Sequence, residues 1–411
     1  MKAGALISAT AAIATFSVLG VLEVRMALAD YWFRQGTVRG IEKAIRLEPD
    51  GAPYYVQLAG LVQESNPPAS AQGLQRALAL NPRDSQSWIE LGLRAEASGN
   101  LAGAEPNLLT AARVDRLYFP RWSLANYYFR HDELEKFWRW AREAVNMSYD
   151  DLAPLFNLCW RVTSDGELIA RELDIREASR EASYLTYLTE QNRAEPTTRA
   201  AARLLAWNRE ADVPVLEAAC DRLIADDRAS DALPIWNTLS EHRKIPYGII
   251  RPDMGQSLTN GDFRALPTSK GFDWRMPGVA GVTLWLQQRP AGLRFTFSGR
   301  QPESCELLAQ YLAVMEDSKY DLRCRYRTSG IAPGTGLAWR IADPKGTRVL
   351  AQGASLAAEA DTEDQLAFRT PPGSHLVYLA LTYQRALGTT RIEGSITLRN
   401  VQVVSERAPR P

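Results

Sequence analysis

Adjacent carboxylates are the residues of this 411-residue chain whose type best suits a chemical reaction. Examples are Glu316–Asp317, Asp226–Asp227 and Glu363–Asp364. A glycosidase needs two carboxyl groups on either side of a sugar, but adjacent side chains on a strand or loop point apart, so we interpret these pairs as solvated charge. The motifs G-x-x-x-x-G-K-[ST], H-E-x-x-H and G-x-S-x-G do not occur, and the chain has three histidines. We therefore predict no catalytic residue.

Cysteine chemistry offers no second site. The four cysteines lie singly, without a C-x-x-C pair: Cys159, Cys220, Cys305 and Cys324. This spacing indicates neither a zinc site nor a disulfide scaffold. From Tyr320 to Tyr326 apolar residues alternate with charged ones, which predicts a strand with one buried face. We therefore expect a buried thiol at Cys324 and favour it over a disulfide with Cys305.

The balance of charged residues argues against nucleic acid as a partner. Lys plus Arg and Asp plus Glu each number 48, so the chain has no overall positive charge with which to bind nucleic acid. The 45% apolar and 23% charged residues are typical of a globular protein. Residues 1–245 carry 28 basic and 33 acidic side chains, and residues 246–411 carry 20 and 15. Two halves with formal charges of −5 and +5 are typical of two different domains.

An uncharged segment lies near the start of the chain. Ala3–Leu22 holds 20 residues without a charge, about 30 Å of helix, which is long enough to cross a bilayer. Ala27–Ala29 resembles a signal-peptide cleavage site, so a cleaved signal peptide is the alternative. Glu23 and Arg25 interrupt the approach to that site, which favours an uncleaved signal anchor over residues 1–29. In both cases we expect the rest of the chain to be exported, because a short positive tail normally stays inside.

Residues 30–243 show a helical repeat. Alanines recur at spacings of 33, 34 and 33 residues: Ala44, Ala77, Ala111 and Ala144. Residues 85–116 resemble the tetratricopeptide repeat at its signature positions: Trp88, Leu91, Gly92, Ala104, Leu108 and Ala111. The resemblance implies a packed helix pair per unit, although Arg116 and Phe137 depart from the family's usual proline and alanine. Tyr187–Arg193 and Leu223–Arg228 indicate two further helix–turn segments, so we predict one degenerate α-solenoid up to residue 243.

A solenoid of this kind presents a concave groove to its partners, which predicts protein binding. The candidate groove residues are polar or aromatic and lie off the face that carries the repeated aromatic and leucine residues: Gln63, Glu64, Gln86, Glu96, Tyr127, Arg130 and His131. For each of them an ordinary solvated helix surface is the alternative.

Composition changes to a β pattern from residue 244. We predict a linker with the first strand over residues 244–262, an antiparallel β-sandwich over 263–407 and a tail over 408–411. Seven strand-like runs are separated by Gly, Pro, Asp and Ser: 282–287, 293–297, 307–314, 320–327, 337–341, 376–383 and 396–404. Ile396 and Leu398 have one parity in the last run and Val401 has the other, which predicts a bulge near Arg399 and Asn400.

Four short motifs in this region resemble jelly-roll carbohydrate-binding modules: Asn260–Phe263, Phe272–Trp274, Leu308–Leu312 and Tyr320–Cys324. The resemblance implies a glycan site, and aromatic side chains bind sugars by stacking on their apolar faces. We take Trp274 and Trp339 as glycan-binding candidates, with sandwich core as the alternative. For Trp285, Tyr378 and Tyr383, which lie within apolar strands, we favour core.

These modules often hold a structural calcium ion through two acidic residues. Asp262 is present at the opening segment, but Arg399 stands about where the second acid would be. We therefore predict no calcium, no other metal and no cofactor.

The order of membrane segment, degenerate repeats and sandwich, with the runs Arg251–Phe263 and Gly271–Arg275, resembles bacterial tetratricopeptide proteins of exopolysaccharide or surface-glycan assembly. This resemblance implies a single-pass protein of the bacterial inner membrane with most of its chain in the periplasm. We expect a non-enzymatic scaffold that binds partner proteins, with polysaccharide as a candidate second ligand, and that binds no nucleic acid. The alternative is a carbohydrate-active enzyme whose active site lies in the sandwich cleft, which requires two facing acids across a tryptophan-lined cleft.

Overall fold

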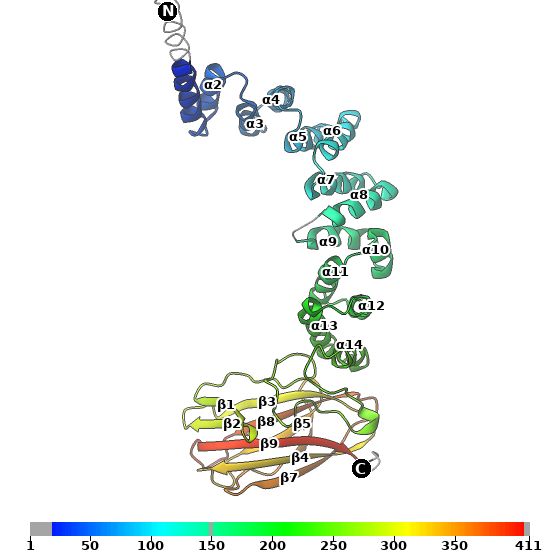
Figure 1. Cartoon of the computed structure of the whole chain (residues 1–411), viewed down its shortest axis with the longest axis vertical. Coiled ribbons are helices and arrows are strands. Elements are labelled where there is room, and N and C mark those ends of the chain that lie inside the picture. The colour runs from blue at the N-terminus through cyan, green and yellow to red at the C-terminus, as the bar shows by residue number, and fades with distance from the viewer. Residues whose placement is uncertain (1–18, 148–150, 407–411) are drawn as a thin grey trace, which may run out of the picture. The chain divides into compact units, whose positions relative to one another are not determined.

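The computed structural model describes residues 19–147 and 151–406. Two compact units divide the chain, Met1–Ile175 and Arg176–Pro411. The described elements of the first unit are helices, and the second contains both helices and two β-sheets (Figure 1). The predicted order of α followed by β is confirmed.

The first unit is a series of helical hairpins. After a helix over residues 19–33, its elements are α2 (Val38–Leu47), α3 (Ala52–Leu61), α4 (Pro67–Leu80), α5 (Ser85–Ala97), α6 (Leu101–Val114), α7 (Tyr118–Arg130), α8 (Leu134–Met147), α9 (Ala153–Val162) and α10 (Gly166–Leu173). The helices α3, α5 and α7 begin 33 residues apart, at Ala52, Ser85 and Tyr118. The spacing of the alanines in the sequence therefore corresponds to the length of one helix pair.

Small residues let the paired helices approach closely. Ala104, Leu108 and Ala111 are fully buried, and a Cβ added at Gly92 would lie 2.8 Å from the Leu108 Cγ. Phe137 of α8, in the place of the usual alanine, is also fully buried. The third hairpin thus accommodates a large ring where the preceding hairpin has the methyl group of Ala104.

The predicted membrane segment falls mainly outside the described residues, because residues 3–18 are not among them. The rest of it lies in the helix over 19–33, which runs through Ala27–Ala29 without a break. Among residues 19–147 and 151–406, no helix combines the length and the apolar character needed to cross a bilayer.

The second unit begins with two more helical hairpins. Its helical elements are α11 (Ala178–Glu190), α12 (Ala194–Leu205), the 3₁₀ turn η1 (Glu210–Asp212), α13 (Val213–Ala225), α14 (Ala229–Glu241) and the 3₁₀ turn η2 (Pro252–Met254). The turns at 191–193 and 226–228 lie within the two segments predicted as helix–turn units. These four helices belong to the same compact unit as the sandwich, whereas the sequence suggested a boundary at residue 243.

The sandwich consists of two antiparallel sheets. Its strands are β1 (Val282–Gln288), β2 (Ala291–Ser298), β3 (Ser304–Ala313), β4 (Lys319–Ser329), β5 (Leu337–Ala342), β6 (Val349–Gln352), β7 (Thr362–Arg369), β8 (Leu376–Gln384) and β9 (Glu393–Ser405). The five-stranded sheet has the order β1-β2-β9-β4-β7 and the four-stranded sheet β3-β8-β5-β6, and Figure 1 shows them stacked. The buried side chains between them form one hydrophobic core.

The predicted bulge is confirmed. Arg325 of β4 pairs with Asn400 of β9, and the next residue, Tyr326, pairs with Leu398. Arg399 is therefore the extra residue, and it lets Leu398 and Val401 both face the core despite their opposite parity.

Candidate functional site

Four of the predicted groove residues form one cluster between consecutive repeats. Arg130, at the end of α7, donates from Nε and Nη2 to the two carboxylate oxygens of Glu96 on α5, at 2.8 and 2.6 Å. The Nε2 of His131 lies 3.0 Å from Glu96 Oε1, and the His131 ring packs on Tyr127 with centroids 4.5 Å apart. The cluster is thus an ion-paired joint between two hairpins.

The electrostatics of Glu96 reflect this joint. Its side chain is 13% exposed, and this burial alone would raise the pKa of the carboxyl. The hydrogen bonds and charge of Arg130, together with His131, outweigh burial and hold the pKa below its ordinary value of 4.5. The Glu96 carboxylate therefore forms a structural contact with Arg130 and His131 and is not an unpaired carboxylate on the surface.

The other groove candidates flank a large hollow between hairpins. Gln63 and Glu64 lie in the turn after α3, at the rim of a groove with a volume of about 1180 Å³ between α4, α5 and α6. The wall on the α4 side includes Pro67, Pro68, Ala71 and Gln75, and the α5 wall includes Leu93 and Arg94. Leu93 is 40% exposed. Gln86 is exposed near the start of α5 and does not line this groove.

Arg94 is the groove residue that the sequence analysis missed. Its guanidinium donates to Ser70 Oγ on α4, to Glu90 Oε2 at 3.1 Å and to Gln63 Oε1 at 3.3 Å. It therefore connects two hairpins at the floor of the groove. The spacing of Glu90 and Arg94, one helical turn apart, was the sequence signal that could have identified it.

Both predicted glycan-binding tryptophans are in the core, so this interpretation was wrong. Trp274 and Trp339 are each 0% exposed, and their ring centroids lie 6.3 Å apart. The indole N–H of Trp274 donates to the Asn260 carbonyl at 3.0 Å, because its loop folds over the end of the sandwich. A sugar cannot stack on either ring.

The prediction that Trp285 lies in the core was also wrong. The apolar run around it predicted core, but its side chain is 67% exposed. β1 is the edge of the five-stranded sheet, and Trp285 pairs with the exposed Arg294 of β2, whereas Leu284 pairs with the buried Phe295. Trp285 therefore lies on the outer face of the sheet. Tyr383 is fully buried as predicted, and Tyr378 is partly buried.

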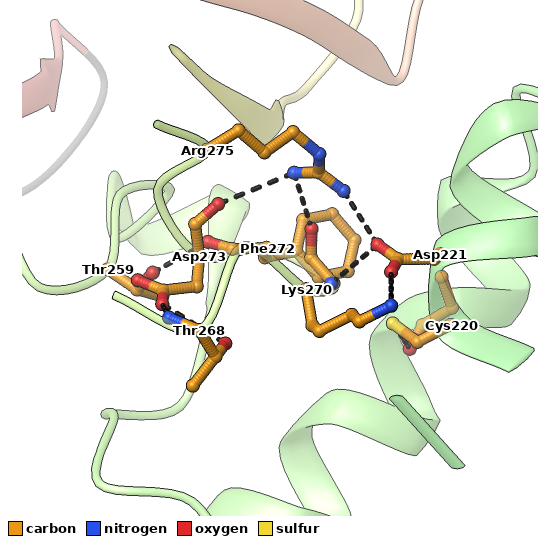
Figure 2. Close-up of polar contacts among 10 residues, drawn as sticks. Cys220, Asp221, Thr259, Thr268, Lys270, Phe272, Asp273 and Arg275 are labelled. Atoms are coloured by element: carbon orange, nitrogen blue, oxygen red, sulfur yellow. Dashed lines mark hydrogen bonds and ion pairs between the residues drawn. The ribbon is translucent and has the colours of Figure 1, made fainter. Parts of the chain in front are cut away.

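A polar junction joins α13 to the loop that enters the sandwich (Figure 2). Asp221 of α13 accepts hydrogen bonds from Arg275 Nη2 at 2.6 Å and from the Gly271 N–H at 2.7 Å, and Lys270 Nζ lies 3.7 Å from its carboxylate. The Arg275 guanidinium also lies over the Tyr311 ring of β3, 4.6 Å from its centroid. This junction explains why α13 and the sandwich belong to one compact unit.

A second carboxylate lies nearby. Asp273 is fully buried and accepts hydrogen bonds from Tyr247 Oη at 2.7 Å and from Thr268. Burial raises the pKa of Asp273 and that of Asp221, while their hydrogen-bond donors oppose the rise. Both acids are thus enclosed by protein donors, which suits a structural junction better than acid–base chemistry.

The two acids of the adjacent pair Glu316–Asp317 have separate contacts. Asp317 binds Arg369 at 2.7 Å, whereas Glu316 accepts from the Gly373 N–H at 2.6 Å. Two hollows lie at the sandwich, and their linings contain one carboxylate, Asp262, and no tryptophan. The first is lined by Gly248, Ile249, Arg251, Gln256, Leu258, Thr259 and Asn260, and the second by residues 255–258, 261–262 and 400–404. In the part of the chain that the structure describes, no cluster of His, Cys, Asp or Glu is arranged to hold a metal ion.

All four cysteines are free thiols. Cys324 is buried on β4 as predicted, between Leu322 and Tyr326 on the same face. Burial raises the pKa of the Cys324 thiol to about 12, so it is unreactive at neutral pH.

No protein-family model matches the chain, and no curated protein matches its sequence. Solved structures similar to it include MamA, at 18% identity over 31% of this chain and 77% of MamA, with a TM-score of 0.27. A CBM4 structure is 10% identical over 36% of this chain and 100% of its own, with a TM-score of 0.30. YrrB, described as a TPR protein with an unusual peptide-binding site, is 11% identical over 50% of this chain and 94% of YrrB, with a TM-score of 0.26. Likeness at this level does not say what this chain binds.

Proposed function

We propose that this protein is a non-enzymatic scaffold that holds a segment of a partner protein in the groove between α4, α5 and α6. The observation that carries the proposal is the groove itself, whose volume of about 1180 Å³ is large enough for a peptide segment. Its walls combine apolar surface at Leu93, Pro67 and Pro68 with the polar side chains of Gln63 and Gln75. A mixed surface of this kind suits a peptide, which offers both side chains and backbone groups.

The groove is held in shape by its own contacts. Arg94 ties α5 to Ser70 of α4, and the Glu96–Arg130 pair ties α5 to α7. A site that is formed before its ligand arrives loses less conformational entropy on binding. Solenoid repeats are suited to this role, because each hairpin is fixed by its neighbours.

The finer parts of the proposal concern place and pathway. We propose that the protein is anchored in a bacterial inner membrane by residues 1–29, faces the periplasm, and acts in exopolysaccharide or surface-glycan assembly with its sandwich in contact with glycan. The uncharged run Ala3–Leu22 supports the anchor. The combination of helical repeats and sandwich in one chain supports the pathway.

The enzyme alternative has less support. Asp221 and Asp273 are occupied by Arg275, Tyr247 and backbone N–H groups, and the two hollows at the sandwich contain one carboxylate. A glycosidase needs two carboxyl groups facing the same sugar.

Capture of partners by the full-length chain tests the scaffold proposal. Leu93→Arg places a charge on the groove wall, and Leu387→Arg makes the same change at a residue that is 99% exposed on the sandwich. We expect a partner that is retained by the unmodified chain and by Leu387→Arg but lost by Leu93→Arg. Equal retention by both variants would mean that the groove is not the binding site.

A further inference from the structure

The outer face of the five-stranded sheet carries an unusual set of side chains. Trp285 on β1, Arg294 on β2, Thr397 on β9 and Arg327 on β4 are paired in register across four neighbouring strands. They therefore form one row on the same face, with the tryptophan at one end and an arginine at the other. We call this set the Trp–Arg row.

Further arginines extend this face along β4. Arg323, Arg325 and Arg327 occupy alternate positions and are exposed, while Leu322, Cys324 and Tyr326 between them are buried. β4 therefore directs its arginines outward and its apolar residues into the core. Asn400 and Gln402 of β9 pair with Arg325 and Arg323, and so add amide groups beside the guanidinium groups.

The positive charge in the middle of the face is not neutralised. Among the described residues, Arg323 and Arg327 have no carboxylate within 4.0 Å, and the only such contact of Arg325 is to Asp361 at 4.0 Å. Besides Asp361, the carboxylates of the face are Glu363 on the edge strand β7, which pairs with Arg325 in register, Asp321 two residues after the start of β4 and Glu393 at the start of β9. Arg294, Arg323 and Arg327 have no carboxylate paired with them in register.

We propose that this face binds a carboxylated polysaccharide, with a sugar ring stacked on Trp285 and carboxylates paired with Arg294 and Arg327. Guanidinium groups bind carboxylates through two parallel hydrogen bonds, and an exposed indole offers an apolar surface to a sugar ring. The Trp–Arg row crosses three inter-strand spacings, about 14 Å, which suits a chain of sugars rather than one. This inference rests on the proposed contact of the sandwich with glycan and specifies its chemistry.

The composition of the face favours a polysaccharide over a protein partner. The core of a protein interface is formed by several apolar anchors, whereas Trp285 is the one large apolar side chain of the Trp–Arg row. Hydroxyl and amide groups at Thr397, Asn400 and Gln402 surround the arginines. Such groups match the dense hydroxyls of a sugar chain.

The test measures binding of the purified full-length chain to polygalacturonate and to the same polymer with its carboxyl groups methyl-esterified. We expect binding to the acidic form that weakens on the order of tenfold or more with the ester. Trp285→Ala and Arg327→Gln should each weaken binding to the acid polymer on the order of tenfold. Arg348→Gln is the matched control, because Arg348 is exposed but lies outside this face, and it should keep the unmodified affinity.

Three results would overturn the inference. Equal binding of the ester would show that carboxylates are not recognised. Equal binding of inorganic polyphosphate, with no effect of Trp285→Ala, would show a surface that attracts any polyanion. If polygalacturonate does not bind while partner capture through the Leu93 groove is intact, this face is not a carboxylated-glycan site. The scaffold proposal would still stand in that case.

Discussion

Arg130 and Glu96 form a two-pronged ion pair that joins α7 to α5, with N–O distances of 2.8 and 2.6 Å. The two residues lie 34 positions apart, one repeat length, so they lie near the ends of equivalent helices in consecutive hairpins. The groove between α4, α5 and α6 depends on α5 being held in place, and this pair is one of the contacts that hold it.

We predict that breaking this ion pair lowers the stability of the protein by an amount that depends on pH. The folded protein lowers the pKa of Glu96, so ionised Glu96 stabilises the fold. This stabilisation is fully present above the pKa of Glu96 in the unfolded chain, near 4.5, and is lost as the pH falls through its pKa in the folded protein. Glu96→Gln should cost about 1 kcal/mol at pH 7, an upper value for a partly exposed pair. Thermal unfolding of both proteins at pH 7 and pH 3 checks this, and a cost that does not shrink at pH 3 would contradict it.

The close packing of paired helices gives a second prediction. Ala111→Trp should overpack the contact with its neighbours and destabilise the protein by about 1 to 3 kcal/mol or more, because Ala111 is fully buried on α6. Ala102→Trp makes the same change at an exposed position of α6 and should stay within about 0.5 kcal/mol. Thermal unfolding of the two variants checks the order, and equal melting temperatures would refute the repeat register.

The tryptophans of the sandwich give a third prediction. Trp274→Ala should destabilise the sandwich by about 3 to 5 kcal/mol, because it removes a fully buried ring that contacts Trp339. Trp285→Ala should change stability by at most about 0.5 kcal/mol, because the ring is 67% exposed. Denaturant unfolding followed by circular dichroism in the β region measures both. A larger loss for Trp285→Ala would place that ring in the core.

The junction of Figure 2 gives a fourth prediction. Asp221→Ala leaves Arg275 and the Gly271 N–H without their acceptor, which should cost about 1 to 3 kcal/mol. Amide hydrogen exchange should accelerate in residues 268–275, where α13 fixes the loop. Asp253→Ala removes an exposed carboxylate from the same unit and should leave exchange in this loop unchanged. Unchanged protection in Asp221→Ala would show that the loop is fixed by other contacts.

Much of the fold follows from periodicity. The alanine spacing predicted the helical hairpins, because a residue that fits only where helices approach must recur once per unit. The bulge at Arg399 was predictable for a similar reason, since Leu398 and Val401 can both face the core only if one residue is extra. Glu96, Arg130 and His131 came together because they are about one repeat apart.

The wrong or missing predictions concern features that depend on three-dimensional surroundings, which the periodicity of the sequence does not reveal. The run around Trp285 is apolar at consecutive positions, so parity could not show which face of β1 points outward. Trp274 follows glycines and polar residues typical of a loop, but that loop folds over the sandwich core. β7 was missed because its charged residues hide the alternation of a strand that is exposed at the sheet edge, and β6 because it is four residues long.

The most direct test of the scaffold account is site-specific photo-crosslinking from the full-length chain in its native cells. A photoreactive residue at Leu93 or Gln75 samples the groove, and one at Arg113 samples an exposed position of α6 outside it. The account predicts that both groove positions crosslink to the same partner protein and that Arg113 does not. The same partner captured equally from Arg113, or no partner captured from either groove position, would contradict it.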